Sequence, residues 1–173
     1  MKGKMYHLLS PTKFTLMSEK VQSLVKEIAR LLISQNKSLS VAESCTGGKI
    51  SSIITSFSGS SNFFKGGLIA YSNSVKTDQL AVKAEDIQKY SAVSEKVAIQ
   101  MAEGIKNQFL ADYAIATTGY AGPNGKKVGQ VFIAFSSNIK TIVKECFFKG
   151  ERKEIVNEAA IETLTILLAE IKK

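Results

Sequence analysis

Apolar and polar positions repeat with two different periods along this chain, and the two periods separate helices from strands. Apolar residues that recur every three or four positions predict amphipathic helices. This spacing is found in residues 18–35, 47–57, 94–110 and 151–173, and shorter helical pieces are predicted at 74–82 and 84–90. Ser18 and Ser94 open two of these runs with a hydroxyl that can accept a backbone N–H, so both are predicted N-caps.

Runs rich in β-branched and aromatic residues predict five strands between these helices. They cover residues 38–44, 67–73, 112–119, 129–137 and 140–148. The last two follow each other closely and predict an antiparallel hairpin, whereas the alternation of helices and strands elsewhere predicts parallel pairs. The expected fold class is therefore α/β, a three-layer α/β/α arrangement with a mixed, mostly parallel sheet.

The length of 173 residues suits one domain. We expect a single folded domain over residues 18–173 and a flexible, basic N-terminal extension over residues 1–17. No run of about 18 apolar residues occurs, so neither a membrane-spanning helix nor a membrane partner is expected. The N-terminus lacks the pattern of a secretory signal, and two cysteines make no disulfide framework, which favours a cytoplasmic protein.

Charge and histidine content narrow the chemistry further. The formal net charge is +8, from 23 basic and 15 acidic side chains. Such a balance is typical of a solvated basic surface and also favours anionic partners, but no nucleic-acid motif accompanies it, so a nucleic-acid partner is not expected. His7 is the only histidine, which excludes a Ser-His-Asp triad in the folded body. Cys45 and Cys146 stand alone in the sequence, so no metal site is expected.

Three loops should meet beyond the carboxyl ends of the strands, where open α/β sheets bind ligands. They read ESCTGG, YSNSVK and TTGYAGPNG, and they begin at Glu43, Tyr71 and Thr117. The third loop offers two hydroxyls and a glycine-rich backbone that suit a polar ligand or a phosphate. The same glycines would serve a simple turn before the hairpin.

Ser44 lies where a strand gives way to a helix led by Gly47 and Gly48. The N–H groups near these glycines could hold an oxyanion, so a serine at this junction can act as a nucleophile. The alternative is that Ser44 or Thr46 only caps the helix. Cys45 is a further possible nucleophile, although free cysteine more often serves as a small buried apolar group.

A nucleophilic serine needs a base, and without histidine the choice is among lysine, tyrosine and carboxylate. Lys76 and Tyr71 of the second loop and Glu43 beside Ser44 are the candidates. An ordinary lysine has a pKa of roughly 10.4, and desolvation or a nearby cation could lower it toward roughly 7–8. Alternatively, Tyr71 packs on the core with its hydroxyl at the rim, Lys76 is an ordinary surface charge, and Glu43 orients the loop.

Four blocks of residues occur in one order and one spacing: AESCTGG, GSSNFFKGGLIAYSN, AVSEKVAIQMA and TTGYAGP. In this combination the chain resembles the CinA C-terminal-domain family, whose members include the bacterial nicotinamide-nucleotide amidohydrolase, over roughly residues 20–170. The resemblance implies a three-layer α/β fold and a serine amidohydrolase that needs no metal or cofactor and is usually a homo-oligomer. Its reaction would hydrolyse the carboxamide of nicotinamide mononucleotide to nicotinate mononucleotide and ammonia.

The family motifs also imply roles for individual residues. Ser44 would be the nucleophile, and Tyr71 and Lys76 would transfer the proton. Arg152, which could otherwise pair only with acidic neighbours, would belong to the pocket. The candidate substrate-binding residues are Glu43, Thr46, Gly47, Gly48, Ser60, Ser61, Asn73, Thr118, Gly119, Gly122 and Arg152.

Two positions depart from the family pattern. Tyr120 stands where an aliphatic residue is usual, and Val156 stands where relatives often carry a second arginine. Both changes affect the expected shape and charge of the pocket. The alternative function is therefore a non-catalytic nucleotide- or nucleic-acid-binding module associated with competence or damage response.

Overall fold

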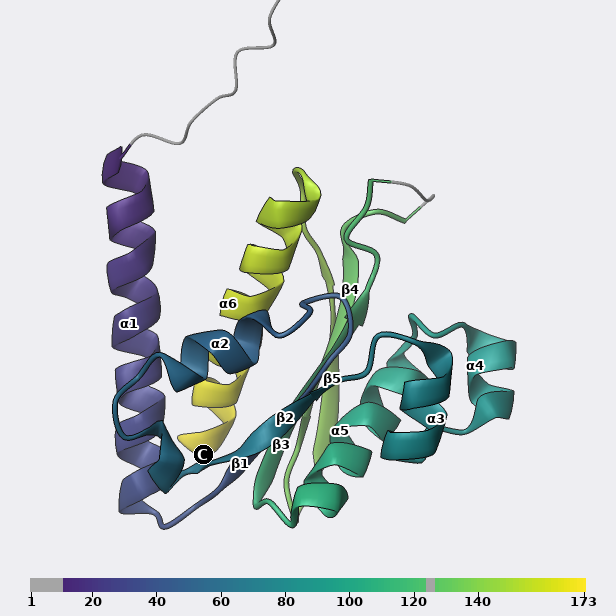
Figure 1. The fold of residues 1–173 in the computed structure, drawn as a ribbon, viewed down its shortest axis with the longest axis horizontal. Helices are drawn as coiled ribbons and strands as arrows, with labels where there is room; N and C mark the ends of the chain where they lie inside the picture. Colours follow the sequence, from purple (N-terminus) through teal and green to yellow (C-terminus); the bar gives the residue numbers. More distant parts are fainter. Residues whose placement is uncertain (1–10, 124–126) are drawn as a thin grey trace, which may run out of the picture.

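A computed structural model describes residues 11–123 and 127–173, with side chains from residue 19 onward (Figure 1). Six α-helices, one short 3-10 helix and five strands occur in this part of the chain. The helices are α1 (Pro11–Ser34), α2 (Lys49–Thr55), α3 (Asn73–Leu80), α4 (Ala84–Tyr90), α5 (Glu95–Phe109) and α6 (Arg152–Ile171). The strands are β1 (Leu39–Glu43), β2 (Phe64–Ile69), β3 (Tyr113–Gly119), β4 (Gln130–Ser136) and β5 (Thr141–Phe147), and η1 (Ser60–Asn62) precedes β2.

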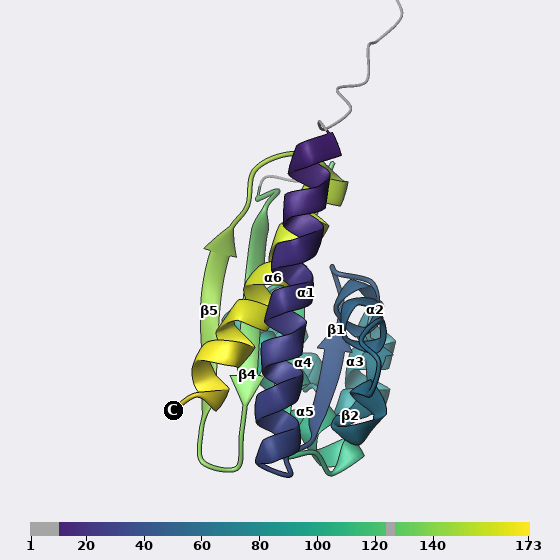
Figure 2. The ribbon, with the colours of Figure 1, turned by 90° about the vertical axis from the view of Figure 1, so that its left-hand side faces the viewer.

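The sheet runs in the order β2-β1-β3-β4-β5 between two layers of helices. Helices α1, α2 and α6 lie on one face, where α1 and α6 pack side by side (Figure 2). Helices α3, α4 and α5 lie on the other face, with α5 directly against the sheet (Figure 1). Each face has its own apolar core, and the three-layer α/β/α prediction is confirmed.

Strand directions make the sheet mixed, as predicted. β1 pairs in parallel with β2 and β3, whereas β3–β4 and β4–β5 are antiparallel. Four of the five strands therefore point the same way, and the fifth, β4, runs in the opposite direction. The hairpin of β4 and β5 is confirmed. β1 is buried along its whole length because it lies between two strands and under helices on both faces.

Local capping explains where the predicted helices begin. Ser94 accepts the N–H of Val97 at the start of α5, as predicted. Glu151 and Glu154 form a capping box at the start of α6. The predicted cap at Ser18 is wrong, because α1 begins at Pro11 and continues through that position. The extension predicted for residues 1–17 therefore overlaps α1, and its residues 1–10 lie outside the described residues.

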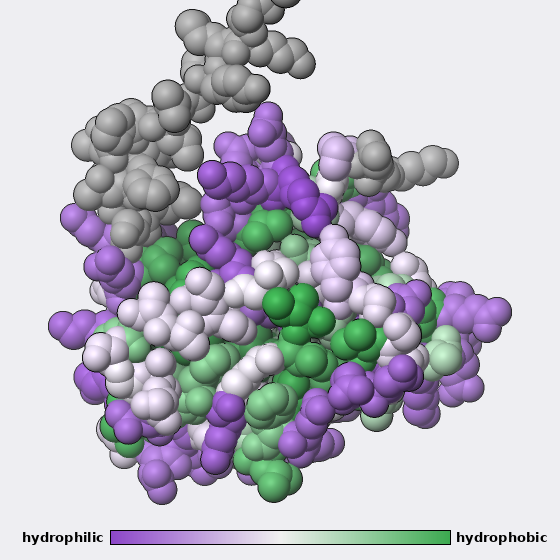
Figure 3. Space-filling view, in the orientation of Figure 1, coloured by the Kyte–Doolittle hydropathy of each residue, from purple (hydrophilic) through white to green (hydrophobic). Residues whose placement is uncertain are grey.

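Strand β2 differs most from its prediction. It covers Phe64–Ile69 rather than residues 67–73, and it is an edge strand whose exposure alternates instead of a buried one. Figure 3 shows apolar side chains gathered over the middle of the face where β2 lies, and Ile69 in this strand is half exposed. The apolar residues of this segment are typical of a buried strand. In the sheet, however, β2 has a neighbouring strand on one side only, because it is the first strand in the order.

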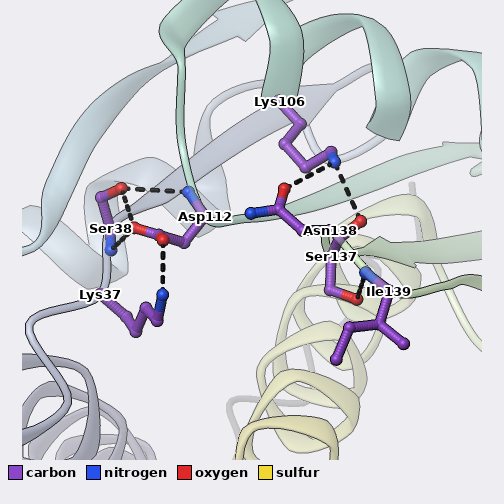
Figure 4. Close-up of polar contacts among 7 residues, drawn as sticks. All are labelled: Lys37, Ser38, Lys106, Asp112, Ser137, Asn138 and Ile139. Carbon is purple, nitrogen blue, oxygen red and sulfur yellow. Dashed lines mark hydrogen bonds and ion pairs between the residues drawn. The ribbon is translucent and has the colours of Figure 1, made fainter.

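The amino ends of β1 and β3 are joined by a cluster of polar contacts. Asp112 accepts hydrogen bonds from the Lys37 Nζ at 2.8 Å and from the Ser38 hydroxyl at 2.7 Å and N–H at 2.9 Å (Figure 4). This cluster lies at the amino ends of the strands, and the loops that follow β1 and β3 lie at the opposite, carboxyl ends. No helix in residues 11–123 and 127–173 combines the length and the apolar character needed to cross a membrane.

Candidate active site

A pocket opens where β1, β2 and β3 end, at the edge of the sheet that the sequence predicted. Its volume is about 260 Å³, close to the lower limit of pockets that hold small ligands. All three predicted loops reach it, together with the loop after α4 and the start of α6. The lining residues are Ser44, Cys45, Tyr71, Asn73, Lys76, Ala92, Val93, Thr118, Gly119, Tyr120, Ala121, Gly122 and Arg152.

Ser44 and Lys76 meet at the floor of this pocket. Ser44 follows the last residue of β1, and its N–H donates to the carbonyl of Thr117 on β3 at 3.0 Å. Lys76 lies in α3, and its Nζ is 3.2 Å from the Ser44 Oγ. The side chain of Lys76 is only 1% exposed, although it carries an amine. The alternative that Lys76 is an ordinary surface charge is therefore wrong.

The surroundings of Lys76 make its ammonium easier to deprotonate than that of an exposed lysine. Burial lowers its pKa below the ordinary lysine value, since an ammonium loses hydration in this position. Its Nζ contacts the carbonyl oxygens of Ala70 at 2.7 Å and Tyr71 at 3.4 Å. None of the ion pairs found in the described part of the chain includes it. In the structure the Nζ donates to both carbonyls and to the Ser44 Oγ, and only after losing a proton can the same amine accept the hydroxyl hydrogen of Ser44.

Glu43 has a structural role instead of a place in the pocket. Its buried carboxylate accepts the N–H groups of Gly48 at 2.9 Å, Ile50 at 3.1 Å and Ser51 at 2.8 Å, and the Ser51 hydroxyl at 2.7 Å. It therefore satisfies the amino end of α2, where a negative charge is favoured. None of these bonds joins Glu43 to a pocket residue, whereas the Lys76 Nζ contacts the Ser44 Oγ directly.

The two glycines shape the turn into α2. Gly47 has φ +57° and Gly48 has φ +94°, a left-handed conformation that glycine adopts without strain. The N–H of Gly47 donates to the Ser44 carbonyl at 3.2 Å, and that of Gly48 donates to Glu43. Because the N–H groups of Gly47 and Gly48 already have acceptors, an oxyanion at Ser44 would have to be held by other N–H groups near these glycines.

Two further N–H groups, those of Cys45 and Thr46, precede the glycines in this turn. Within the described residues neither the N–H of Cys45 nor that of Thr46 donates to a backbone carbonyl, although the Cys45 N–H faces its own thiol. The Thr46 hydroxyl pairs with that of Thr117 at 2.8 Å, so it does not cap α2. Burial raises the pKa of the Cys45 thiol to about 12, so this side chain stays a neutral wall of the pocket rather than a thiolate.

Tyr71 and Arg152 meet at the rim of the pocket. The Arg152 Nη2 donates to the Tyr71 hydroxyl at 3.0 Å, and its Nη1 donates to the carbonyl of Gly122 at 2.7 Å. Tyr71 is 62% exposed. The alternative that Tyr71 packs on the core is therefore wrong, because its side chain is largely exposed and its hydroxyl is bound to Arg152. Arg152 thereby connects the loop that follows β2 with the third loop.

The remaining candidates divide into three groups. Asn73, Thr118, Gly119 and Gly122 line the pocket, and the buried Thr118 hydroxyl donates to the Ala92 carbonyl at 2.7 Å. Ser60 and Ser61 belong to η1, which precedes β2, and this chain places them near the opposite edge of the sheet. Ser61 lines a separate hollow there with Lys37 and Asp112. Gly47, Gly48, Thr46 and Glu43 shape the turn behind Ser44.

Some pocket residues escaped the sequence analysis. Ala92 and Val93 follow α4 and have small apolar side chains without a reactive group. The only sequence signal that could have indicated them is their position just before the N-cap Ser94. Ala121 and Tyr120 lie inside the third loop, and Tyr120 was noted there only as a departure. Within residues 11–123 and 127–173, no three His, Cys, Asp or Glu side chains gather in a way that could hold a metal ion.

Comparison with known proteins places this geometry in a family. The model of the CinA C-terminal domain matches residues 21–171, almost all of the described body. The chain belongs to the CinA C-terminal domain family. A relative from Clostridioides difficile and a CinA-like protein from Flavobacterium psychrophilum are each 41% identical to it over 160 residues.

These CinA relatives are longer proteins. The match covers 90% of this chain but only 38% of each of the two, so the chain spans well under half of their length. A solved structure of similar size is the competence or damage-inducible protein from Enterobacter asburiae. It is 34% identical, has a TM-score of 0.85, and the alignment covers 87% of this chain and 98% of that one.

Proposed function

We propose that this CinA-family domain hydrolyses the carboxamide of nicotinamide mononucleotide, giving nicotinate mononucleotide and ammonia. The observation that carries the proposal is the contact between the Ser44 Oγ and the Lys76 Nζ at 3.2 Å in a pocket. A buried lysine with a lowered pKa is a suitable base for a serine hydroxyl.

In the first half of the reaction the Ser44 Oγ attacks the amide carbon while its proton passes to the neutral amine of Lys76. The N–H groups of Cys45 and Thr46, which follow Ser44 in the turn, are candidates to stabilise the oxygen that becomes negative. The resulting ammonium of Lys76 then returns the proton to the departing nitrogen. Ammonia leaves, and an ester joins Ser44 to the nicotinoyl group.

In the second half of the reaction water attacks this ester. Lys76, neutral again, takes a proton from the water and returns it to the Ser44 oxygen as the ester bond breaks. One water is consumed, and one ammonia and one carboxylic acid are released. Arg152 and Asn73 line the pocket and are the polar groups suited to the phosphate and the sugar.

The test measures ammonia release from nicotinamide mononucleotide, with nicotinamide and nicotinamide riboside as comparison compounds. Turnover of the mononucleotide alone is expected, and Ser44→Ala should abolish it without lowering the melting temperature. Ser52→Ala is the matched control, because Ser52 is an exposed serine of α2 outside the pocket.

Two results would contradict the proposal. Full turnover by Ser44→Ala would remove Ser44 as the nucleophile. No ammonia from any of the three compounds, together with DNA binding that weakens steeply with salt, would favour the non-catalytic binding module instead.

A further inference from the structure

Besides Cys45, the apolar part of the pocket wall comes from two segments. Ala92 and Val93 follow α4, and Tyr120 and Ala121 follow β3. The polar lining residues Ser44 and Lys76 meet each other, and Arg152 lies at the rim. A ligand that reaches Ser44 therefore shares the pocket with the wall to which Tyr120 belongs, and this wall suits its least polar part.

Tyr120 is held in place through its backbone and its side chain. Its N–H donates to the Gln130 carbonyl at 2.9 Å, and its carbonyl accepts the Gly129 N–H at 2.7 Å. Its hydroxyl lies 3.1 Å from the Ser91 Oγ. A ring fixed in this way loses little conformational freedom when a ligand binds against it.

Ser91 shows that this contact matters to the wall. Its φ of +79° and ψ of 153° form a backbone conformation that side chains other than glycine rarely adopt. Such a conformation persists only where neighbouring contacts hold it. The Ser91 hydroxyl pairs with Tyr120, and the next residue, Ala92, accepts the Thr118 hydroxyl. Both tethers come from the end of β3 and hold the Ala92–Val93 wall against the pocket.

We propose that Tyr120 is a specificity-determining residue whose ring binds the face of a cationic heteroaromatic ring. This inference rests on the proposed function, because the N-glycosylated pyridine of nicotinamide mononucleotide is a planar cation. None of the described lining residues carries a carboxylate, so a π face is the group available to meet that charge. Lys76 and Arg152 would instead meet the reacting end and an anionic end of the substrate.

Two tyrosines line the pocket, and their exposure separates them. Tyr71 is 62% exposed and its hydroxyl is bound to Arg152 at the rim. Tyr120 is half-buried. Attraction between a cation and an aromatic face is stronger where water is excluded, which favours Tyr120.

The experiment measures binding by calorimetry to the Ser44→Ala chain, which should not turn the substrate over. The ligands are nicotinamide mononucleotide, its reduced dihydropyridine form, and ribose 5-phosphate, which lacks the ring. Adding Tyr120→Ile should weaken binding of the mononucleotide about tenfold, since loss of a stacked aromatic ring has an effect of this order. Binding of ribose 5-phosphate should change less than about twofold. Tyr120→Phe, which keeps the ring, should restore most of the affinity.

Several outcomes would overturn the inference. Equal weakening of both ligands by Tyr120→Ile would mean that the ring does not read the pyridine. Loss of discrimination in Tyr71→Ile but not in Tyr120→Ile would assign the role to Tyr71. If Tyr120→Ile fails to fold, the chain with Tyr120 intact still decides, because equal affinity for the oxidised and reduced mononucleotides contradicts recognition of a cation.

Ammonia release by the unaltered chain separates this inference from the proposed function. Without ammonia release, the proposed function and this inference fail together. With ammonia release and an unchanged KM in Tyr120→Ile, only the role of Tyr120 fails.

Discussion

The Lys76 Nζ lies 3.2 Å from the Ser44 Oγ, and 32 positions of sequence separate the two residues. Burial lowers the pKa of this lysine, and no residue lies between the amine and the hydroxyl. Tyr71, the other candidate base, has its hydroxyl bound to Arg152 instead. The geometry thus favours direct proton transfer from Ser44 to Lys76.

The first prediction separates the two candidate bases. Lys76→Met should lower kcat for ammonia release by about 10²–10⁴, the usual contribution of a positioned base. Tyr71→Phe removes one hydrogen bond to Arg152 and should lower kcat/KM only about two- to tenfold. Steady-state kinetics of both variants checks this. A larger loss in Tyr71→Phe than in Lys76→Met would make the phenol the base.

The second prediction concerns the pH dependence of stability. The folded-state pKa of Lys76 lies below its unfolded value of about 10.4, so between these two values the unfolded chain binds more protons. The parent chain should gain stability relative to Lys76→Met as pH rises through this window, and the difference should be constant below it. Urea unfolding of both proteins from pH 6 to about 10.5 measures the difference. A difference that falls as pH rises would contradict the buried, easily deprotonated amine.

The third prediction follows from the role of Glu43 at α2. Glu43→Gln should destabilise the protein by about 1.5–3 kcal/mol, because a buried charge-assisted network loses acceptors and gains a donor facing N–H groups. Turnover should fall as well, since Ser44 adjoins this turn. The control is Glu85→Gln, an exposed carboxylate in the first turn of α4, which should cost less than about 1 kcal/mol. Equal losses in the two variants would mean that the Glu43 network contributes little.

The fourth prediction concerns the cluster of Lys37, Ser38 and Asp112 in Figure 4. Burial opposes ionisation of Asp112, but hydrogen bonds from Lys37 and Ser38 outweigh it and lower its pKa to about 2. The cluster should therefore stabilise the fold above about pH 4, and this contribution should disappear as pH falls toward 2. Asp112→Asn should cost about 1–2 kcal/mol at pH 7, a moderate value because the side chain is partly exposed.

The control for this prediction is Asp78→Asn, which changes an exposed aspartate of α3. Chemical unfolding at pH 7 and at pH 3 measures both variants. If Asp112→Asn and Asp78→Asn have the same effect at pH 7, the Asp112 cluster does not hold the amino ends of β1 and β3 together.

Much of the fold was predictable because its signals are local. The apolar spacing of α5 and the hydroxyl of Ser94 act within one or two turns of helix, and the β4–β5 hairpin joins neighbouring segments. Strand β2 was less predictable. Its apolar residues are typical of a buried strand, and only the order of strands in the sheet decides that it lies at the edge.

The sequence by itself determined the three-layer class, the edge of the sheet where the loops meet, and the residue types that gather there. The tertiary structure alone decided what each residue does. Burial between elements lowers the pKa of Lys76, the amino end of α2 engages Glu43, and the position of η1 separates Ser60 and Ser61 from the pocket. The physical reason is that pKa values and hydrogen-bond partners depend on neighbours in space, and these neighbours come from distant parts of the chain.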